Sequence, residues 1–259
     1  MNRFLKRAWA EIDLDALEHN YSEIKKLAKG KDILAVVKAN AYGHDDKAVC
    51  LKLQELGVKY YGVSNLWEGE KLRCHGITGT ILTFGYTDED YFDELLEYGI
   101  TQTAGSVQYA KQLSDYAVSK GVKLPVHIKV NTGMTRVGID SQQEMLDILA
   151  MPGLDCKAAY THFAAADRQQ EKLMKIAKDK GLLIHSQNSG GIIYHGDFGG
   201  DIVRAGVILY GHYPNYPLEV PFDMKSVMTV KSVVSQLKTI PAGTQISYGR
   251  TYTAEKEMT

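Results

Sequence analysis

The sequence has few cysteines, almost no net charge and no long apolar run, and each shortage excludes a class of protein. The three cysteines are odd in number, widely separated and without a CxxC pair, which argues against a disulfide framework and a zinc site. A formal net charge of −1 offers no basic surface for nucleic acid or an anionic membrane. No run approaches the roughly 18 apolar residues of a membrane helix, and the N-terminal segment MNRFLKRAWAEIDL lacks the apolar core of a signal peptide. We therefore expect a cytoplasmic protein with no membrane segment, no nucleic-acid partner and no metal.

The chain does contain a regular alternation of strand-like and helix-like segments, and its 259 residues can bury a large core. Eight segments rich in apolar or β-branched residues are expected to be strands: 33–39, 60–64, 80–84, 101–104, 126–130, 158–163, 183–186 and 202–207. Helical patterns lie between most of them, at 45–56, 67–75, 88–98, 107–120, 142–150 and 168–180. A short strand at 9–14 and a helix at 15–29 come first. This alternation predicts an α/β fold, a (β/α)8 TIM barrel.

The pattern changes after Tyr210. Residues 228–239 alternate apolar and polar, like a strand with one solvated face, and residues 241–253 add a turn and another strand-like piece. A few strands do not form a stable independent domain. We therefore interpret the tail as the start of a β-rich C-terminal domain that is truncated, and expect a barrel over residues 8–220 followed by an incomplete β domain over residues 221–259.

The most informative segment is VVKANAYGH at residues 36–44, where a β-branched run ends on Lys38. The carboxyl end of a parallel barrel strand is where barrel enzymes present catalytic groups. Partial desolvation there lowers the pKa of an amine and suits a lysine to covalent catalysis. Taken alone, such a lysine is more often merely solvated. The segment is therefore a candidate site that needs support from the rest of the chain.

Five polar residues fall at or just beyond the ends of expected strands: Lys38, Lys129, His162, Ser189 and Arg204. Each has an ordinary structural explanation, since the histidine suits a core position, the arginine an ion pair and the serine a helix N-cap. If the strands close in order, however, all five side chains converge on one mouth of the barrel. That convergence favours a single binding or catalytic site.

Six segments, taken in order, resemble the alanine racemase family. They are VVKANAYGH, HIKVNTGMTRVG (127–138), THFAAAD (161–167), NSGG (188–191), VRAGVILYG (203–211) and ISYGRTYTAEKE (246–257). Any one of these would be a weak signal, but six in the same order are highly specific. The resemblance implies an amino-acid racemase that uses pyridoxal 5′-phosphate (PLP) as its cofactor.

The resemblance also implies how the cofactor is held. Lys38 carries PLP, and the tyrosine four residues later, Tyr42, binds its phosphate. Ser189 and the backbone amides near Gly206 and Val207 complete the phosphate site. Glycine suits close backbone approach, and amides at the start of a helix favour an anion.

Further residues are assigned to the ring and the substrate by the same resemblance. Arg204 faces the pyridine nitrogen, and because arginine stays charged it keeps that nitrogen unprotonated, which favours racemisation over transamination. His162 is expected to buttress Arg204. Arg136 reaches the phenolic oxygen of the cofactor and the carboxylate of the substrate. Lys129, which is often carbamylated in the family, helps to position Arg136.

Racemisation needs a base on each face of the α-carbon. The resemblance assigns Lys38 to one face and Tyr248 to the other, although a tyrosine with an ordinary pKa near 10 needs cationic neighbours to act as a base. In the family this tyrosine comes from the other subunit. We therefore expect a homodimer once the C-terminal domain is complete.

Three functional hypotheses remain open at this point. The first is a racemase that interconverts L- and D-alanine and supplies D-alanine for peptidoglycan. The second is a serine-preferring racemase of the kind found in vancomycin-resistance clusters. The third is a single-domain PLP-binding protein that serves cofactor homeostasis without turnover, against which Tyr248 and the β-type tail argue.

Overall fold

The computed structural model describes residues 7–164, 166–214 and 223–259. The chain divides into two compact units, one over residues 12–228 and one formed by residues 1–11 with 229–259. The expected boundary between residues 220 and 221 lies outside the described residues, so it stays a prediction. Within the described part, no helix is long and apolar enough to cross a membrane.

The larger unit is an eight-stranded parallel barrel, as the alternation predicted. Its strands are β2 (Asp32–Val36), β3 (Tyr60–Val63), β4 (Thr80–Thr83), β5 (Ile100–Ala104), β6 (Leu124–Lys129), β7 (Leu154–Tyr160), β8 (Leu183–His185) and β9 (Ile202–Ala205). Neighbouring strands pair in parallel from β8 back to β2, and β2 also pairs with β9. The gap between β8 and β9 is bridged by two backbone hydrogen bonds, Asp201 N to the Ile184 oxygen and Arg204 N to the Gln187 oxygen, both 2.8 Å. The sheet is thereby nearly closed.

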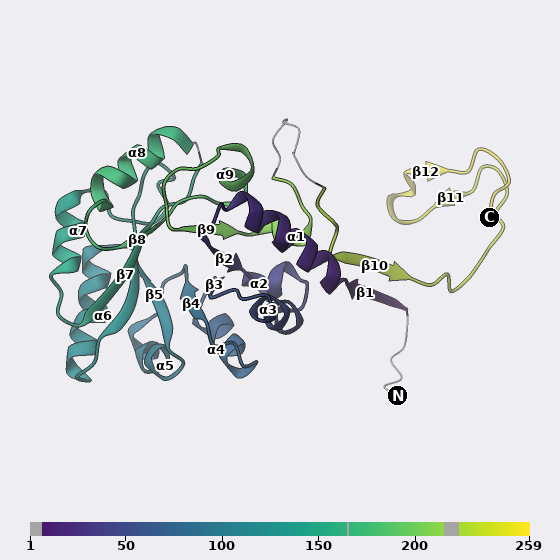
Figure 1. Ribbon diagram of the computed structural model, residues 1–259. Coiled ribbons are helices and arrows are strands. Elements are labelled where there is room, and N and C mark those ends of the chain that lie inside the picture. The colour runs from purple at the N-terminus through teal and green to yellow at the C-terminus, as the bar shows by residue number, and fades with distance from the viewer. Residues whose placement is uncertain (1–6, 165, 215–222) are drawn as a thin grey trace. The chain divides into compact units, whose positions relative to one another are not determined.

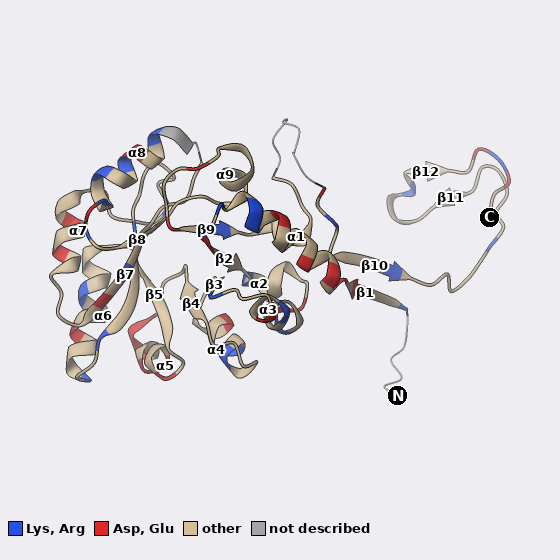
Figure 2. Cartoon of the chain, viewed as in Figure 1, with Lys and Arg blue, Asp and Glu red and all other residues tan. Residues whose placement is uncertain are grey.

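Helices surround these strands, as Figure 1 shows. They are α3 (Asp46–Glu55), α4 (Leu66–Cys74), α5 (Phe92–Glu97), α6 (Val107–Ser119), α7 (Gln142–Leu149), α8 (Ala166–Ala177) and α9 (Ser189–Tyr194), with short turns α2 (Lys38–Tyr42), η1 (Glu89–Tyr91) and η2 (Val207–Tyr210). The first helix, α1 (Leu14–Leu27), packs against η2, α3 and α9. It thus covers the barrel where the last strand meets the first. Figure 2 shows charged residues of both signs mainly on the outer helices and loops.

The register of the strands divides the inside of the barrel into two clusters. The apolar interior cluster consists of Leu34, Val36, Leu82 and Ile202, all buried. The polar interior cluster consists of Thr103, His127, Lys129, Tyr160, His185 and Arg204, also buried, on neighbouring positions of β5 to β9. A larger apolar core fills the space between the strands and the helices.

The smaller unit contains little regular structure. β1 (Ala8–Ile12) pairs with β10 (Met228–Ser232), and β11 (Gln245–Ile246) pairs antiparallel with β12 (Tyr252–Thr253) around the turn η3 (Tyr248–Arg250). Ala254 is the only buried residue among the described residues of this unit. The strand expected over residues 228–239 is longer than the observed one, because β10 ends at Ser232; the next residue, Val233, donates its amide to the Arg7 oxygen at 3.2 Å.

Candidate active site

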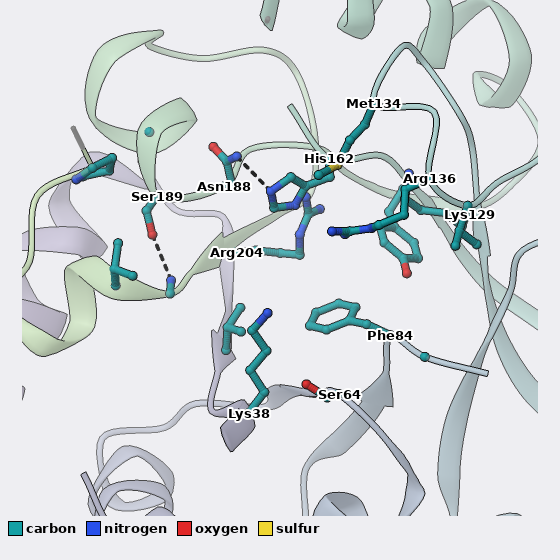
Figure 3. Close-up of a pocket in the computed structure, with 18 of the residues that line it drawn as sticks. Lys38, Ser64, Phe84, Lys129, Met134, Arg136, His162, Asn188, Ser189 and Arg204 are labelled. Carbon is teal, nitrogen blue, oxygen red and sulfur yellow. Dashed lines mark hydrogen bonds between the residues drawn. The ribbon is translucent and has the colours of Figure 1, made fainter. Parts of the chain in front are cut away.

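A cavity of about 530 Å³ opens among the residues that follow the barrel strands. Every site residue that the sequence predicted in the barrel lines it: Lys38, Tyr42, Lys129, Arg136, His162, Ser189, Arg204, Gly206 and Val207. Figure 3 shows the Lys38 side chain rising into the cavity beside Phe84, with His162, Arg136 and Arg204 opposite. The ends of separate strands thus supply one site, as in other parallel barrels.

Lys38 and Tyr42 are the two ends of the unusual turn α2. Residues Ala39, Asn40, Ala41 and Tyr42 all have φ between 53° and 56°, so the turn is left-handed. For non-glycine residues such backbone costs about 1–2 kcal/mol each. The turn closes through hydrogen bonds from Ala41 N to the Val37 oxygen and from Gly43 N to the Ala39 oxygen. A strained segment at a cavity mouth indicates a functional constraint on the positions of its side chains.

A small cradle lies at one end of the cavity, where α9 and η2 begin. The Gly206 amide donates to Ser189 Oγ at 3.0 Å. A Cβ atom on residue 206 would lie 3.3 Å from the Tyr42 hydroxyl oxygen and 3.5 Å from Ser189 Oγ, so a side chain there would fill the cradle. Asn188, not Ser189, caps α9 by accepting from Gly191 N, which leaves the serine hydroxyl available to the cradle. Burial raises the pKa of Tyr42, so its hydroxyl stays protonated and can donate to an anion.

Arg204 is buried and held rigidly in the polar interior cluster. Its guanidinium donates to the backbone oxygens of Thr161, His185 and Ser186. Burial lowers its pKa to about 10, so the group still carries its charge at neutral pH. The expectation that His162 buttresses Arg204 is wrong: the imidazole hydrogen-bonded to Arg204 is that of His185, at 3.1 Å. The Nε2 atom of His162 is paired with the Asn188 amide at 3.3 Å instead.

The hydrogen bonds behind Arg204 determine the proton positions of two histidines. Because a guanidinium only donates, Nδ1 of His185 accepts and its proton must sit on Nε2. That Nε2 lies 3.1 Å from Nδ1 of His127, which must accept in turn. Burial lowers the pKa of His127 to about 4 and that of His185 well below its usual range, so both are neutral. The sequence reasoning missed both residues, although each lies at an inward-facing strand position.

Tyr160 connects the members of the polar interior cluster. Its ring stacks on His185 with centroids 4.7 Å apart, and Lys129 Nζ and the Arg204 guanidinium carbon lie 5.5 and 5.4 Å from the ring centroid. Its hydroxyl pairs with Thr103 Oγ1 at 2.9 Å. The aromatic face therefore stabilises two cations whose partners are otherwise mainly backbone groups.

The cavity is strongly electropositive. No aspartate or glutamate is among the described residues that line it, whereas Lys38, Lys129, Arg136 and Arg204 are. Burial, followed by the charges of Arg204 and Arg136, lowers the pKa of Lys129 to about 7. Burial and the same cations lower the pKa of His162 to about 3. Such a cavity favours an anionic ligand.

Two predicted roles are not tested by this geometry. Lys129 Nζ donates to the Val130 oxygen at 2.9 Å, and as an ammonium ion it cannot hydrogen-bond to Arg136, because both groups then only donate. Tyr248 lies in the smaller unit, where its side chain is fully exposed. Both assignments stay predictions.

The protein is a parallel barrel whose cavity contains a lysine on a strained turn, the cradle at Gly206 and several cations, one of them the buried Arg204. This architecture is that of an enzyme that acts on an anionic ligand. Residues 12–214 match the family described as alanine racemase, N-terminal domain, and residues 227–259 match alanine racemase, C-terminal domain. The chain therefore belongs to the alanine racemase family, whose members are isomerases.

Individual relatives agree with this assignment. The chain is 36% identical to an alanine racemase of Clostridium perfringens (strain SM101 / Type A), over 99% of this chain and 72% of that protein. The solved structure of alanine racemase from Clostridium difficile 630 has a TM-score of 0.90 at 34% identity, covering 98% of this chain and 72% of its own. A histidine racemase from Leuconostoc mesenteroides subsp. sake NBRC 102480 has the same TM-score at 27% identity, covering 99% and 73%.

Proposed function

We propose that the protein is a PLP-dependent racemase that interconverts L-alanine and D-alanine by a two-base mechanism, in the cytoplasm and as a homodimer. Its product would be the D-alanine used in peptidoglycan. The observation that carries the proposal is the cradle of Ser189, Gly206 and Tyr42 at one end of a cationic cavity that Lys38 enters. These groups fit a phosphate monoester, because glycine allows close approach and the surrounding donors match its oxygens.

The other residues of the site are assigned to proton transfer and to binding of the substrate carboxylate. PLP, when bound, withdraws electrons from the substrate so that the hydrogen on the α-carbon becomes acidic. Lys38 moves that proton on one face of the carbon, and Tyr248 moves it on the other. Arg136, exposed at the cavity mouth, binds the substrate carboxylate through its planar donor fork.

Arg204 supports racemisation rather than transamination. It has no acceptor atom, and backbone oxygens hold it in place, so it can only donate toward the pyridine nitrogen. Because Arg204 keeps its own proton, it would leave the ring nitrogen of bound PLP unprotonated, and this would favour return of the proton to the α-carbon. The neutral pair His185–His127 behind Arg204 cannot remove its charge.

The test is a cofactor and turnover assay on the chain as it stands. The chain is incubated with PLP and L-alanine, D-alanine is measured, and borohydride is used to trap a covalent link between PLP and Lys38. We expect a trapped link and D-alanine formation in the unmodified chain. We expect loss of both in Lys38→Ala and retention of both in Lys47→Ala, which removes an exposed lysine of α3.

Three further comparisons make the assay specific. Tyr248→Phe should retain the link and lose turnover; full activity in both directions would contradict the second base. L-Serine and L-histidine run in parallel test the substrate, since one structural neighbour is a histidine racemase. A trapped link that persists in Lys38→Ala would contradict the assignment of Lys38 as the cofactor lysine. A trapped link without any racemised product would contradict the proposal that this chain is an active racemase.

A further inference from the structure

The backbone amide directly after Lys38 needs a partner that neither the sheet nor the turn provides. The ladder between β2 and β3 ends with the hydrogen bond from Val37 N to the Gly62 oxygen, and the bonds within the left-handed turn start at Ala41 N. The Ala39 amide lies between these two systems. Ala39 is also the first residue of this turn with positive φ, at 53°, so the left-handed backbone begins there.

The partner of this amide is the carboxylate of Glu68, in the first turn of α4. Glu68 Oε1 accepts from Ala39 N at 2.8 Å, and its Oε2 accepts from Ser64 N at 2.7 Å. One carboxylate therefore joins the backbone just after β2 to the backbone just after β3. The Asn65 side chain, which caps α4, accepts from the Glu68 amide at 3.1 Å and holds the residue in position.

A separate set of contacts holds the next residue of the turn. Asn40 Oδ1 accepts from Asp46 N at 3.1 Å and from Lys71 Nζ at 3.4 Å. Lys71 also forms an ion pair with Asp46 at 2.9 Å. The strained turn is thus held at two points by different side chains, and Glu68 is the one that acts on the peptide group that Lys38 shares with Ala39.

We propose that Glu68 is a positioning residue for the cofactor lysine. Its carboxylate fixes the peptide group after Lys38, and this keeps the strained backbone in the one conformation that directs the Lys38 amine into the cavity. The inference deepens the proposed function and rests on it wherever PLP is concerned. The hydrogen bonds from Ala39 N and Ser64 N to the Glu68 carboxylate form in the chain without cofactor.

The first measurement needs no cofactor. Glu68→Gln keeps one acceptor oxygen but faces the other amide with a donor, whereas Glu55→Gln changes an exposed glutamate of α3 and is the matched control. We expect amide exchange of Ala39, followed by NMR, to accelerate at least about tenfold in Glu68→Gln, since bonds to a charged acceptor are roughly twice as strong as neutral ones. Unchanged exchange at Ala39 would overturn the proposal, whatever the cofactor does.

The second measurement is a double-mutant cycle on PLP affinity, which isolates the coupling between two residues. We expect Glu68→Gln to weaken PLP binding about tenfold in the otherwise unmodified chain and less than about twofold in the Lys38→Ala background. An equal loss in both backgrounds would show that Glu68 does not act through Lys38. If Glu68→Gln does not fold, Glu68→Asp, which keeps the charge and shortens the reach, takes its place in the same cycle.

The two failures can be told apart. A chain that never binds PLP contradicts the proposed function, and the Ala39 exchange rate still decides whether Glu68 holds the turn. A chain that binds PLP with the same affinity before and after Glu68→Gln contradicts the positioning role alone.

Discussion

The two clusters inside the barrel differ in what holds them together. The apolar interior cluster contacts hydrocarbon and aromatic neighbours, so it is stabilised by burial and close fit. The polar interior cluster is equally buried, but its members are bound by hydrogen bonds, as between Thr103 and Tyr160, or between His127 and His185. The first cluster depends on volume, whereas the second depends on which atoms donate and which accept. The cavity lies where the two clusters meet at the mouth of the barrel, with Val36 from the first and Arg204 from the second in its wall.

Removing volume from the apolar interior cluster should have the largest effect on stability. Leu82 is fully buried, and Leu82→Ala should lower the free energy of unfolding by about 2–5 kcal/mol, because a cavity remains in a tightly packed interior. Leu82→Met, which keeps the volume, should cost less than about 1.5 kcal/mol. Urea unfolding measures both; equal losses would show that this cluster is not governed by volume.

Removing one hydroxyl from the polar interior cluster should have a smaller but clear effect at constant shape. Thr103 Oγ1 donates to the Thr83 oxygen at 2.6 Å, so it must accept from the Tyr160 hydroxyl. Thr103→Val leaves the buried Tyr160 hydroxyl without its acceptor and should cost about 1–3 kcal/mol by urea unfolding. Thr103→Ser keeps the hydroxyl and is the control. A valine variant as stable as the serine variant would contradict the distinction between the two clusters.

The polar interior cluster should also make stability depend on pH. The folded pKa of His127 is about 4, below its unfolded value near 6.5, and that of His185 is lowered as well. Below pH 6.5 the unfolded chain therefore binds protons that the folded chain cannot, and stability falls as the pH drops toward 4. The slope approaches about 1.4 kcal/mol per pH unit for each histidine.

Urea unfolding between pH 6.5 and 5 checks this dependence, since most carboxylates stay ionised in that range. His127→Gln keeps an acceptor for His185 Nε2. It should reduce the slope of stability against pH by the contribution of one histidine, at most about 1.4 kcal/mol per pH unit. A slope that His127→Gln does not alter would mean that these histidines are not buried in the neutral form.

Much of the barrel could be predicted because its strands carry their own signal. All eight expected strands are present, and most begin or end within two residues of the expected position. The strand β7 starts at Leu154, earlier than expected, because polar Asp155 and Lys157 hide a strand that pairs with β6. The tail was less predictable: the alternating pattern extends to Thr239, whereas β10 ends at Ser232, and such a pattern alone does not determine where strand pairing stops.

The site was predictable where a residue's identity sets its role, and unpredictable where contacts do. Lys38, Tyr42, Ser189 and Arg204 were found from short motifs, and the fold brings them to one cavity. Glu68 was missed because it lies in an ordinary helix start, 29 residues from the amide it binds. The expected partnership of His162 with Arg204 failed because more than one histidine lies near the arginine, and motif order does not tell which one is hydrogen-bonded to it.

Side-chain types and their spacing along the chain were enough to establish the alternation of strands and helices, the order of the motifs and the resemblance to one family. Three-dimensional packing was needed to establish that His185 holds Arg204, that Tyr160 connects the buried cations and that Glu68 binds the backbone beside Lys38. Those contacts join residues from different strands and helices. Their distances and proton positions follow from the closure of the barrel, which no local pattern of residues encodes.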